Sequence, residues 1–297
     1  MRNKIDPYRY SRKIIFLYLD SFLKERNDVL LSAGIEPVHR MRVASRRLRA
    51  ALSTFKGILP VKKSRAWRKE IAQIGRALGL ARQLDVQIKF LEAARKRLKK
   101  SSRVIHTEGI IRFLKRKREQ AQGRIGIELK GFEIKTRLPG LKDCLRDISS
   151  GSRKSCADTF LARKKAMILK RLDTLLDLAP YVFKPKKTKE LHRMRIAAKK
   201  LRYTLEIFRP SHKGKRFDGY IYASRDIQDS LGDLHELDLL IEVLSGFLKG
   251  PDKGLKATAA YLTRECAGLR KGVYGKFVSL WKNLRKTRLW EKLRRDA

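Results

Sequence analysis

The sequence predicts an all-α protein made of two similar helical bundles, and three observations support this fold class. Apolar residues recur with the 3.6-residue period of helices along most of the 297-residue chain. No Asn-Gly or Asp-Gly pair lies between two alternating apolar stretches, as it would in a β-hairpin. A helical pattern of the first half also returns in the second half. Such a duplication is typical of two bundles related by a pseudo-twofold axis.

Helices are expected along nearly the whole of both halves. Pro37 suits the first turn of the second helix, where the backbone N–H that proline lacks has no partner within the helix. Thr188 is expected to cap the N-terminus of the corresponding helix in the second half. The expected helices span about 8–31, 37–57, 64–80, 83–99 and 104–129, then 156–178, 188–209, 217–232, 235–249 and 254–286.

A linker is expected between the two halves of the chain. The stretch KTRLPGLKDCLRDISSGSRKS (135–155) contains Pro139-Gly140 and a cluster of serine and glycine, which are typical of turns and loops. We therefore expect a first bundle over 1–135, a linker over 136–155 and a second bundle over 156–297, with the two bundles forming one domain.

Two pairs of segments repeat with the same offset of 153 residues. VHRMRVASRRLRAALSTF (38–55) matches LHRMRIAAKKLRYTLEIF (191–208), and IGRALGLARQLDV (74–86) matches IQDSLGDLHELDL (227–239). Two separated matches in one register make chance a poor explanation. The repeat therefore indicates an internal duplication.

Each copy of the first repeated segment places cations beside an apolar face. On a helix of about 100° per residue, four cationic positions fall within about 80° of one another. The first cationic row, as we call it, consists of His39, Arg42, Arg46 and Arg49. The second cationic row consists of His192, Arg195, Lys199 and Arg202. A separate apolar stripe, expected to be buried, is formed by Met41, Leu48, Leu52 and Phe55 in the first copy and by Met194, Leu201, Leu205 and Phe208 in the second.

The charge of the chain favours a polyanionic ligand for these rows. The 73 Lys and Arg residues exceed the 30 Asp and Glu residues, giving a formal charge of +43 that is spread over both halves. Cations about 5 Å apart along a helix repel one another, and we expect no matching row of carboxylates on the same helix to compensate them. A linear polyanion would relieve this repulsion and release counterions. A solvated basic face is the alternative, and the duplication makes it the weaker interpretation.

Other basic residues extend or flank the rows. Arg47 and Lys200 lie on the opposite flank, where they either bind the same ligand or pair with Asp85 and Asp238; both options stay open. The runs Lys115–Arg118 and Arg95–Lys100 are expected to be solvated. Further anion contacts are expected from Arg12 and Lys13 on the first helix and from Tyr203 beside the second row.

The repeated residues resemble a known family. The first copy reads HRMRVASRRLRAALSTF followed by LGLARQLDV, and the second reads HRMRIAAKKLRYTLEIF. Both are similar to the CHAD family, the conserved-histidine α-helical domain, and KKLRYTLEIF is especially close to the later repeat of that family. The resemblance extends in outline over nearly the whole chain, including the last basic and aromatic helix through Trp281.

The resemblance implies a fold of two four-helix bundles, related by pseudo-twofold symmetry, around a basic central groove. It also implies binding of inorganic polyphosphate and association with polyphosphate granules. By motif position, the residues that contact the ligand would be those of the two cationic rows: His39, Arg42, Arg46 and Arg49, with His192, Arg195, Lys199 and Arg202.

An enzyme is not expected, and neither a catalytic residue, a metal site nor a cofactor is predicted. The sequence has no P-loop, no Asp-x-Asp and no histidine pair at metal spacing, which phosphoryl chemistry would favour. General binding of RNA or DNA is the alternative function, since any chain of this charge attracts nucleic acid at low salt. A device for reading bases is missing, and Tyr203 is the one aromatic residue near a row.

The expected location is the cytoplasm. Cys144, Cys156 and Cys266 are few and have no Cys-x-x-Cys spacing, which favours a reducing compartment. The longest early apolar run, Ile14–Leu19, is too short to span a membrane, so no membrane partner is expected. The sequence makes no prediction of the oligomeric state.

Overall fold

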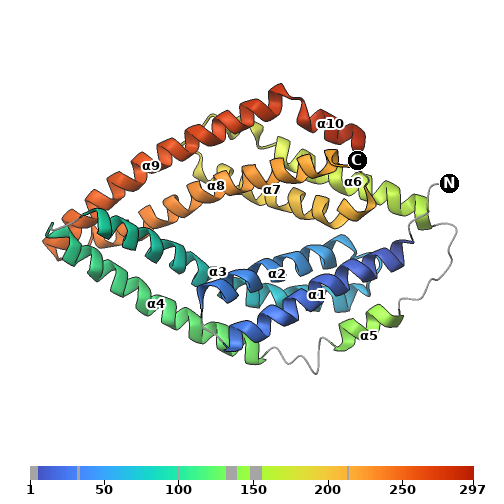
Figure 1. Cartoon of the computed structure of the whole chain (residues 1–297), viewed down its shortest axis with the longest axis horizontal. Coiled ribbons are helices and arrows are strands. Elements are labelled where there is room, and N and C mark those ends of the chain that lie inside the picture. The colour runs from blue at the N-terminus through green and yellow to red at the C-terminus, as the bar shows by residue number, and fades with distance from the viewer. Residues whose placement is uncertain (1–5, 32–33, 99–100, 132–138, 148–155, 213) are drawn as a thin grey trace. The chain divides into compact units, whose positions relative to one another are not determined.

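The computed structural model describes residues 6–31, 34–98, 101–131, 139–147, 156–212 and 214–297. Within these ranges every regular element is a helix (Figure 1), and the protein is all-α as predicted. The first half contains α1 (Pro7–Leu31), α2 (Ile35–Thr54), α3 (Val61–Arg97), α4 (Arg103–Gly131) and α5 (Pro139–Asp147). The second half contains α6 (Cys156–Leu176), α7 (Thr188–Phe208), α8 (Arg216–Phe247), α9 (Lys253–Lys286) and α10 (Leu289–Asp296), with short 3-10 helices at Ala179–Tyr181 and Arg209–Ser211.

The described residues divide into two compact units. Unit 1 comprises those of Met1–Asp85 and Lys115–Arg163, and unit 2 comprises those of Val86–Leu114 and Lys164–Ala297. This partition differs from the division at 135 and 156 that the repeat suggests, because the end of α3 and the beginning of α4 pack with helices of the second half. The bundle boundaries drawn from the repeat stay a prediction.

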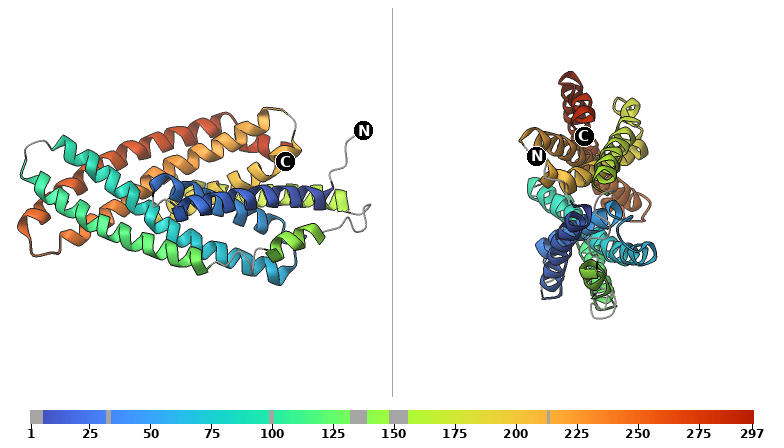
Figure 2. Two further views of the ribbon diagram at one scale, coloured as in Figure 1. Left: turned by 60° about the horizontal axis from the view of Figure 1, so that its bottom comes forward. Right: turned by 90° about the vertical axis from the view of Figure 1, so that its right-hand side faces the viewer.

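The core of unit 1 forms where α1 packs along α2 (Figure 2). The side chains of Leu19 and Phe22 on α1 are completely buried. The apolar stripe of α2 is also buried, as predicted, and consists of Met41, Leu48 and Leu52, with Phe55 just beyond the helix. Burying a side chain of this size stabilises the fold by about 1.5–3 kcal/mol. Because this stripe faces the core, the first cationic row lies on the adjacent face of α2.

In unit 2, α8 packs along both α7 and α9 (Figures 1 and 2). The second apolar stripe is buried here as predicted, through Met194, Leu201, Leu205 and Phe208 of α7. The segment Val86–Leu114 is held in this unit by aromatic contacts. The ring of Phe113 meets that of Phe247 edge-on at 5.3 Å, and the Arg103 guanidinium lies 4.7 Å from the ring centroid of Tyr261.

Two of the predicted helix boundaries are wrong. The segments 64–80 and 83–99 belong to the single helix α3, and 217–232 and 235–249 belong to the single helix α8. Each expected interruption lies just after a glycine, Gly79 or Gly232. A glycine inside a helix costs about 1 kcal/mol relative to alanine, which a long packed helix tolerates.

The predictions for the two helix starts have different outcomes. Pro37 lies in the first turn of α2, as expected. Thr188, however, is the first residue of α7 and not its cap. Lys187 occupies the cap position and makes no side-chain capping bond.

Part of the expected linker is helical. Helix α5 lies inside 136–155, and its residues Leu141 and Leu145 are completely buried in unit 1. The Pro139-Gly140 pair, interpreted as a turn, is the beginning of this helix. Proline is well tolerated in the first turn because its missing N–H has no partner within the helix. The rest of the expected linker, 136–138 and 148–155, lies outside the described residues.

An aspartate at the same position of each repeat pairs with an arginine of the following helix. Arg118 Nε donates to Asp85 Oδ1 at 2.7 Å, and Arg270 Nε donates to Asp238 Oδ1 at 2.5 Å. Arg118 is therefore not part of a solvated run, contrary to the expectation for Lys115–Arg118. Its side chain is 12% exposed and that of Asp85 is 4% exposed.

Replacing Asp85 with asparagine is expected to lower the free energy of unfolding by about 3 kcal/mol, because the Arg118 charge would stay buried without its counter-ion. The matched control is Asp238→Asn. Asp238 is 27% exposed, so water can replace more of the lost interaction and the effect should be smaller. Urea unfolding followed by circular dichroism measures both. Equal losses for the two variants would show that burial does not set the strength of these pairs.

None of the helices within the described ranges contains a stretch long and apolar enough to cross a membrane.

Candidate anion-binding site

The two cationic rows occupy equivalent positions on α2 and α7. His39, Arg42 and Arg46 are half-buried and Arg49 is exposed, beside the buried stripe of α2. On α7 the whole second row is half-buried: His192, Arg195, Lys199 and Arg202. Each row therefore lies at the edge of its core, where part of every side chain reaches the surface.

Arg42 and Arg195, which occupy the same position of the repeat, each lie against a glycine of the following helix. A Cβ atom added to Gly79 of α3 would be 3.7 Å from Arg42 Nε, and one added to Gly232 of α8 would be 3.4 Å from Arg195 Nε. On α3, a Cβ atom added to Gly75 would likewise be 3.5 Å from Ser45 Oγ and 3.9 Å from Arg49 Nη1. The guanidinium groups thus lie close to the backbone of the neighbouring helix.

Several polar atoms of the rows are buried without a hydrogen bond. Among the described residues, no partner is present for His39 Nδ1, His192 Nδ1 or Arg42 Nε. Buried donors and acceptors of native proteins are nearly always paired with protein, water or a ligand. Guanidinium N–H groups donate strongly to phosphate oxygens. An oxyanion that reached the first row would therefore give the Arg42 Nε–H group a partner that the described residues do not supply.

The histidines of both rows have pKa values below the usual value for histidine. For His39 the largest cause is burial, followed by the positive charge of Arg82; Glu36 opposes these effects and Arg46 adds to them. For His192 burial again comes first, followed by Arg195 and Lys199. Both rings are therefore mostly neutral at pH 7 in the free protein. An anion at the row would favour the charged form, since it reverses the sign of the local potential.

Helix α3 contributes cations that sequence reasoning missed. Although the Arg49 side chain reaches the surface, partial burial is the largest cause that lowers its pKa, followed by the charges of Arg76, Arg46 and Arg68. Arg82 acts on His39 in the same way. Arg76 and Arg82 lie three residues before and after Gly79, so the contact between Gly79 and Arg42 turns their side of α3 toward α2. In the sequence, Gly79 was the residue that could have indicated this close contact between α2 and α3.

The second row differs from the first in having a carboxylate of its own helix. Arg202 Nε lies 3.4 Å from Glu206 Oε1, four residues further along α7. The expectation that no carboxylate compensates the rows is therefore wrong for Arg202. The ring of His192 also contacts that of His235 on α8, with 4.0 Å between ring centroids. His235 stands at the repeat position of Arg82.

The remaining candidates do not all join the rows. Tyr203 is 6% exposed and its ring lies under Arg202, 4.8 Å from the guanidinium carbon, so it supports that arginine and offers no surface for stacking. Lys200 is exposed and lines a separate cavity of about 320 Å³ with Asp177. Arg12 and Lys13 are exposed on α1, and Arg47 is half-buried on α2; their role as ligand contacts stays a prediction.

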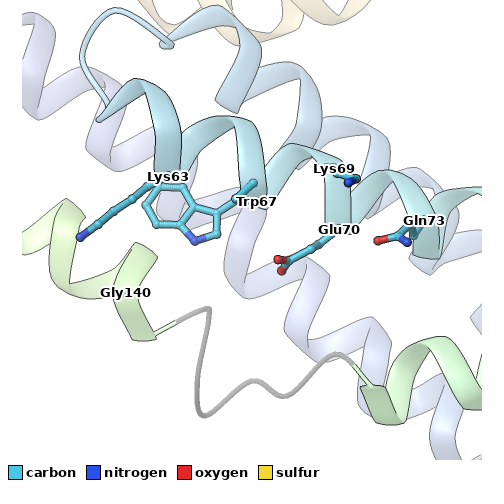
Figure 3. A pocket seen from close by; sticks show the side chains of 7 residues that line it. Lys63, Trp67, Lys69, Glu70, Gln73 and Gly140 are labelled. Carbon is cyan, nitrogen blue, oxygen red and sulfur yellow. The ribbon is translucent and has the colours of Figure 1, made fainter.

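A cavity of about 670 Å³ in unit 1 lies apart from both rows (Figure 3). It is bordered by the first turns of α3 and by Gly140 of α5, and the ring of Trp67 lies beside Lys63 at its edge. Lys63 and Lys69 are exposed and Glu70 supplies a negative charge. This mixture of charges does not form a continuous cationic surface.

The chain is thus an all-α protein in which each copy of a sequence repeat presents a basic row. The family model described as the CHAD domain matches residues 13–245, so the chain belongs to the CHAD domain family.

The fold is also similar to solved structures. The CHAD domain from the plant Ricinus communis superposes with a TM-score of 0.69 at 19% identity, covering 92% of this chain and 93% of that one. PptA from Streptomyces chartreusis gives a TM-score of 0.66 at 15% identity, covering 93% of this chain and 99% of that one. At these identities the likeness concerns the fold. No curated protein matches the sequence.

Proposed function

We propose that this protein binds inorganic polyphosphate through its two cationic rows and does not convert it chemically. The observation that carries the proposal is the first row, where Arg42 lies against Gly79 while its Nε and His39 Nδ1 have no hydrogen-bond partner among the described residues. The CHAD family, to which the chain belongs, is associated in general with polyphosphate.

The spacing of each row supports a linear ligand. Four cationic positions extend over about 15 Å of helix, with about 5 Å of axial rise from one to the next. A chain of phosphates offers a charge on every repeating unit, so one ligand can neutralise all the cations of a row. Single small anions would neutralise one position and leave the neighbouring cations repelling one another.

Competition between polyphosphate and RNA tests the proposal against general nucleic-acid binding. Stacking on aromatic side chains supplies much of the affinity of proteins for single-stranded nucleic acid. Because the ring of Tyr203 is buried, it cannot stack on a base, and this favours polyphosphate over RNA as the ligand. We expect polyphosphate of defined size to bind at about 150 mM salt and to displace RNA at equal phosphate concentration. If RNA displaced polyphosphate instead, nucleic acid would be the better assignment.

Binding is expected to depend strongly on salt and not on metal ions. The slope of log K against log salt should be near −0.7 for each phosphate neutralised, if polyphosphate behaves like a single strand. Fluorescence anisotropy over a salt series measures the slope. EDTA at constant ionic strength should leave the affinity unchanged. Loss of binding in EDTA would mean that a bridging cation is required and that the rows alone are insufficient.

The protein is expected to leave polyphosphate intact. When the protein is incubated with polyphosphate and Mg²⁺ or Mn²⁺, the length of the polyphosphate on a gel should not change. We expect this because the sequence has no P-loop and no Asp-x-Asp motif. Phosphate release that accompanies the purified protein and disappears in His39→Ala would overturn this.

We further propose a cytoplasmic location with binding to polyphosphate granules. A fluorescent fusion should coincide with granules stained for polyphosphate. The same fusion with Arg42, Arg46 and Arg49 replaced by alanine should be spread through the cell, and unchanged granule localisation of that variant would contradict the proposal.

A further inference from the structure

The two rows are equivalent in sequence, but their surroundings are not. The 153-residue offset relates three positions of unit 1 to residues of different charge in unit 2. Arg76 corresponds to Asp229, Arg82 to His235, and Ser53 to Glu206. Each difference makes the surroundings of the second row less positive at neutral pH.

In unit 1 the charges around the row add to it. Arg76 and Arg68 of α3 lie near Arg49, and Arg82 lies near His39. The contact of Gly79 with Arg42 and that of Gly75 with Arg49 place this side of α3 against the row. Glu36 is the carboxylate that acts on His39. The cations of two helices therefore converge, and their mutual repulsion is relieved when an anion binds.

In unit 2 carboxylates already accompany the row. Glu206 Oε1 lies 3.4 Å from Arg202 Nε, and the two side chains are 14% and 12% exposed. Asp233 directly follows Gly232, against which Arg195 lies, and its side chain reaches the surface. Partial burial and the neighbouring Asp229 raise the pKa of Asp233, and the charge of Arg195 opposes them. An incoming phosphate must compete with Glu206 for Arg202 and is repelled by Asp233 beside Arg195.

His235 does not replace the charge of Arg82. Burial, followed by the neighbouring His192 and Arg195, lowers the pKa of His235 to about 4. The ring is therefore neutral at pH 7, where an arginine at the same place carries a full positive charge.

We propose that the two rows are unequal anion sites. Unit 1 holds the principal polyphosphate site, which Arg76 and Arg82 extend from α2 onto α3, and unit 2 holds a weaker site restrained by Glu206 and Asp233. This inference rests on the proposed function and identifies which residues set the affinity of each row.

The test isolates each row and measures binding of tripolyphosphate by calorimetry. One variant keeps only the first row (Arg195→Ala, Lys199→Ala, Arg202→Ala), and the other keeps only the second (Arg42→Ala, Arg46→Ala, Arg49→Ala). We expect the variant with the first row to bind at least about 10-fold more tightly, a difference of about 1.4 kcal/mol.

Two further changes assign the difference to named residues. In the variant with the first row, replacing Arg76 and Arg82 with alanine should weaken binding by at least about 10-fold, as expected for two charged contacts. The matched control removes two exposed cations of unit 1 outside the row, Lys63 and Arg124, and lowers the net charge equally. In the variant with the second row, Glu206→Gln with Asp233→Asn should strengthen binding. Circular dichroism verifies that each variant is folded.

The outcomes separate this inference from the proposed function. If wild type binds neither tripolyphosphate nor long polyphosphate, the proposed function itself is wrong. If wild type binds but the two single-row variants bind equally, only the inequality is wrong. An effect of the Arg76 and Arg82 changes no larger than that of the Lys63 and Arg124 control would likewise overturn the extension onto α3.

Discussion

Replacing Arg42, Arg46 and Arg49 with alanine is expected to weaken the binding of long polyphosphate by at least about 100-fold. A hydrogen bond to a charged group contributes about 1.5–3 kcal/mol, so even a discounted loss of about 1 kcal/mol for each arginine gives about 3 kcal/mol in total. The slope of log K against log salt should also become less steep, by about 0.7 for each phosphate contact removed.

The fold should survive this triple replacement. Met41, Leu48 and Leu52 stay buried on the other side of α2, and removing neighbouring cations relieves repulsion. The control removes three exposed cations of unit 1 outside the row, Lys63, Arg124 and Lys130, for the same change in net charge. If the control weakened binding as much as the row variant, affinity would follow overall charge, and the row would have no special role.

The corresponding change in the second row, Arg195→Ala with Lys199→Ala and Arg202→Ala, should have a smaller effect. Glu206 already pairs with Arg202, so part of the interaction is satisfied within the protein before the ligand arrives. An anion that binds there gains less, because it must replace an existing ion pair.

The rows could be predicted from the sequence because they follow from the helical period alone. A side chain on a helix points in a direction set by its position, so the burial of Met41 and Leu48 places Arg42 and Arg49 beside the core without knowledge of any neighbour. The repeat then supplies a second, independent instance in Met194 and Leu201.

The contributions of the neighbouring helices could not be predicted in this way. Which side of α3 faces α2 depends on the contact between Arg42 and Gly79, and a single helix contains no information about that contact. For this reason Arg76 and Arg82 were missed. The pairing of Arg118 with Asp85 was missed for the same reason, since its residues belong to different helices.

Local signals in the sequence had more than one structural meaning. Gly79 and Gly232 stand next to predicted breaks, but both lie inside continuous helices where an arginine packs on them. Pro139-Gly140 is common in turns, yet it begins α5, which is retained by the burial of Leu141 and Leu145. Tertiary packing decided each of these cases, and its energy exceeds the modest local preference.

The preference for long over short polyphosphate is expected to depend on both rows. Because the rows belong to one chain, a ligand long enough to reach both converts its second binding event into an intramolecular one. Such linkage can raise the apparent affinity by about 10²–10⁴ without any new type of contact. Wild type should therefore bind long polyphosphate much more tightly than tripolyphosphate, compared at equal phosphate concentration.

Either single-row variant should lose most of this preference, since a long chain then meets only one row. The variant that keeps the stronger first row should also lose this preference for long chains. The affinity of that variant for tripolyphosphate should stay close to that of wild type. The ratio of the two dissociation constants, measured by calorimetry for wild type and both variants, gives the result directly. If the variant with only the first row kept the wild-type ratio, the two rows would not share a ligand, and the duplication would serve the architecture of the fold and not the avidity of binding.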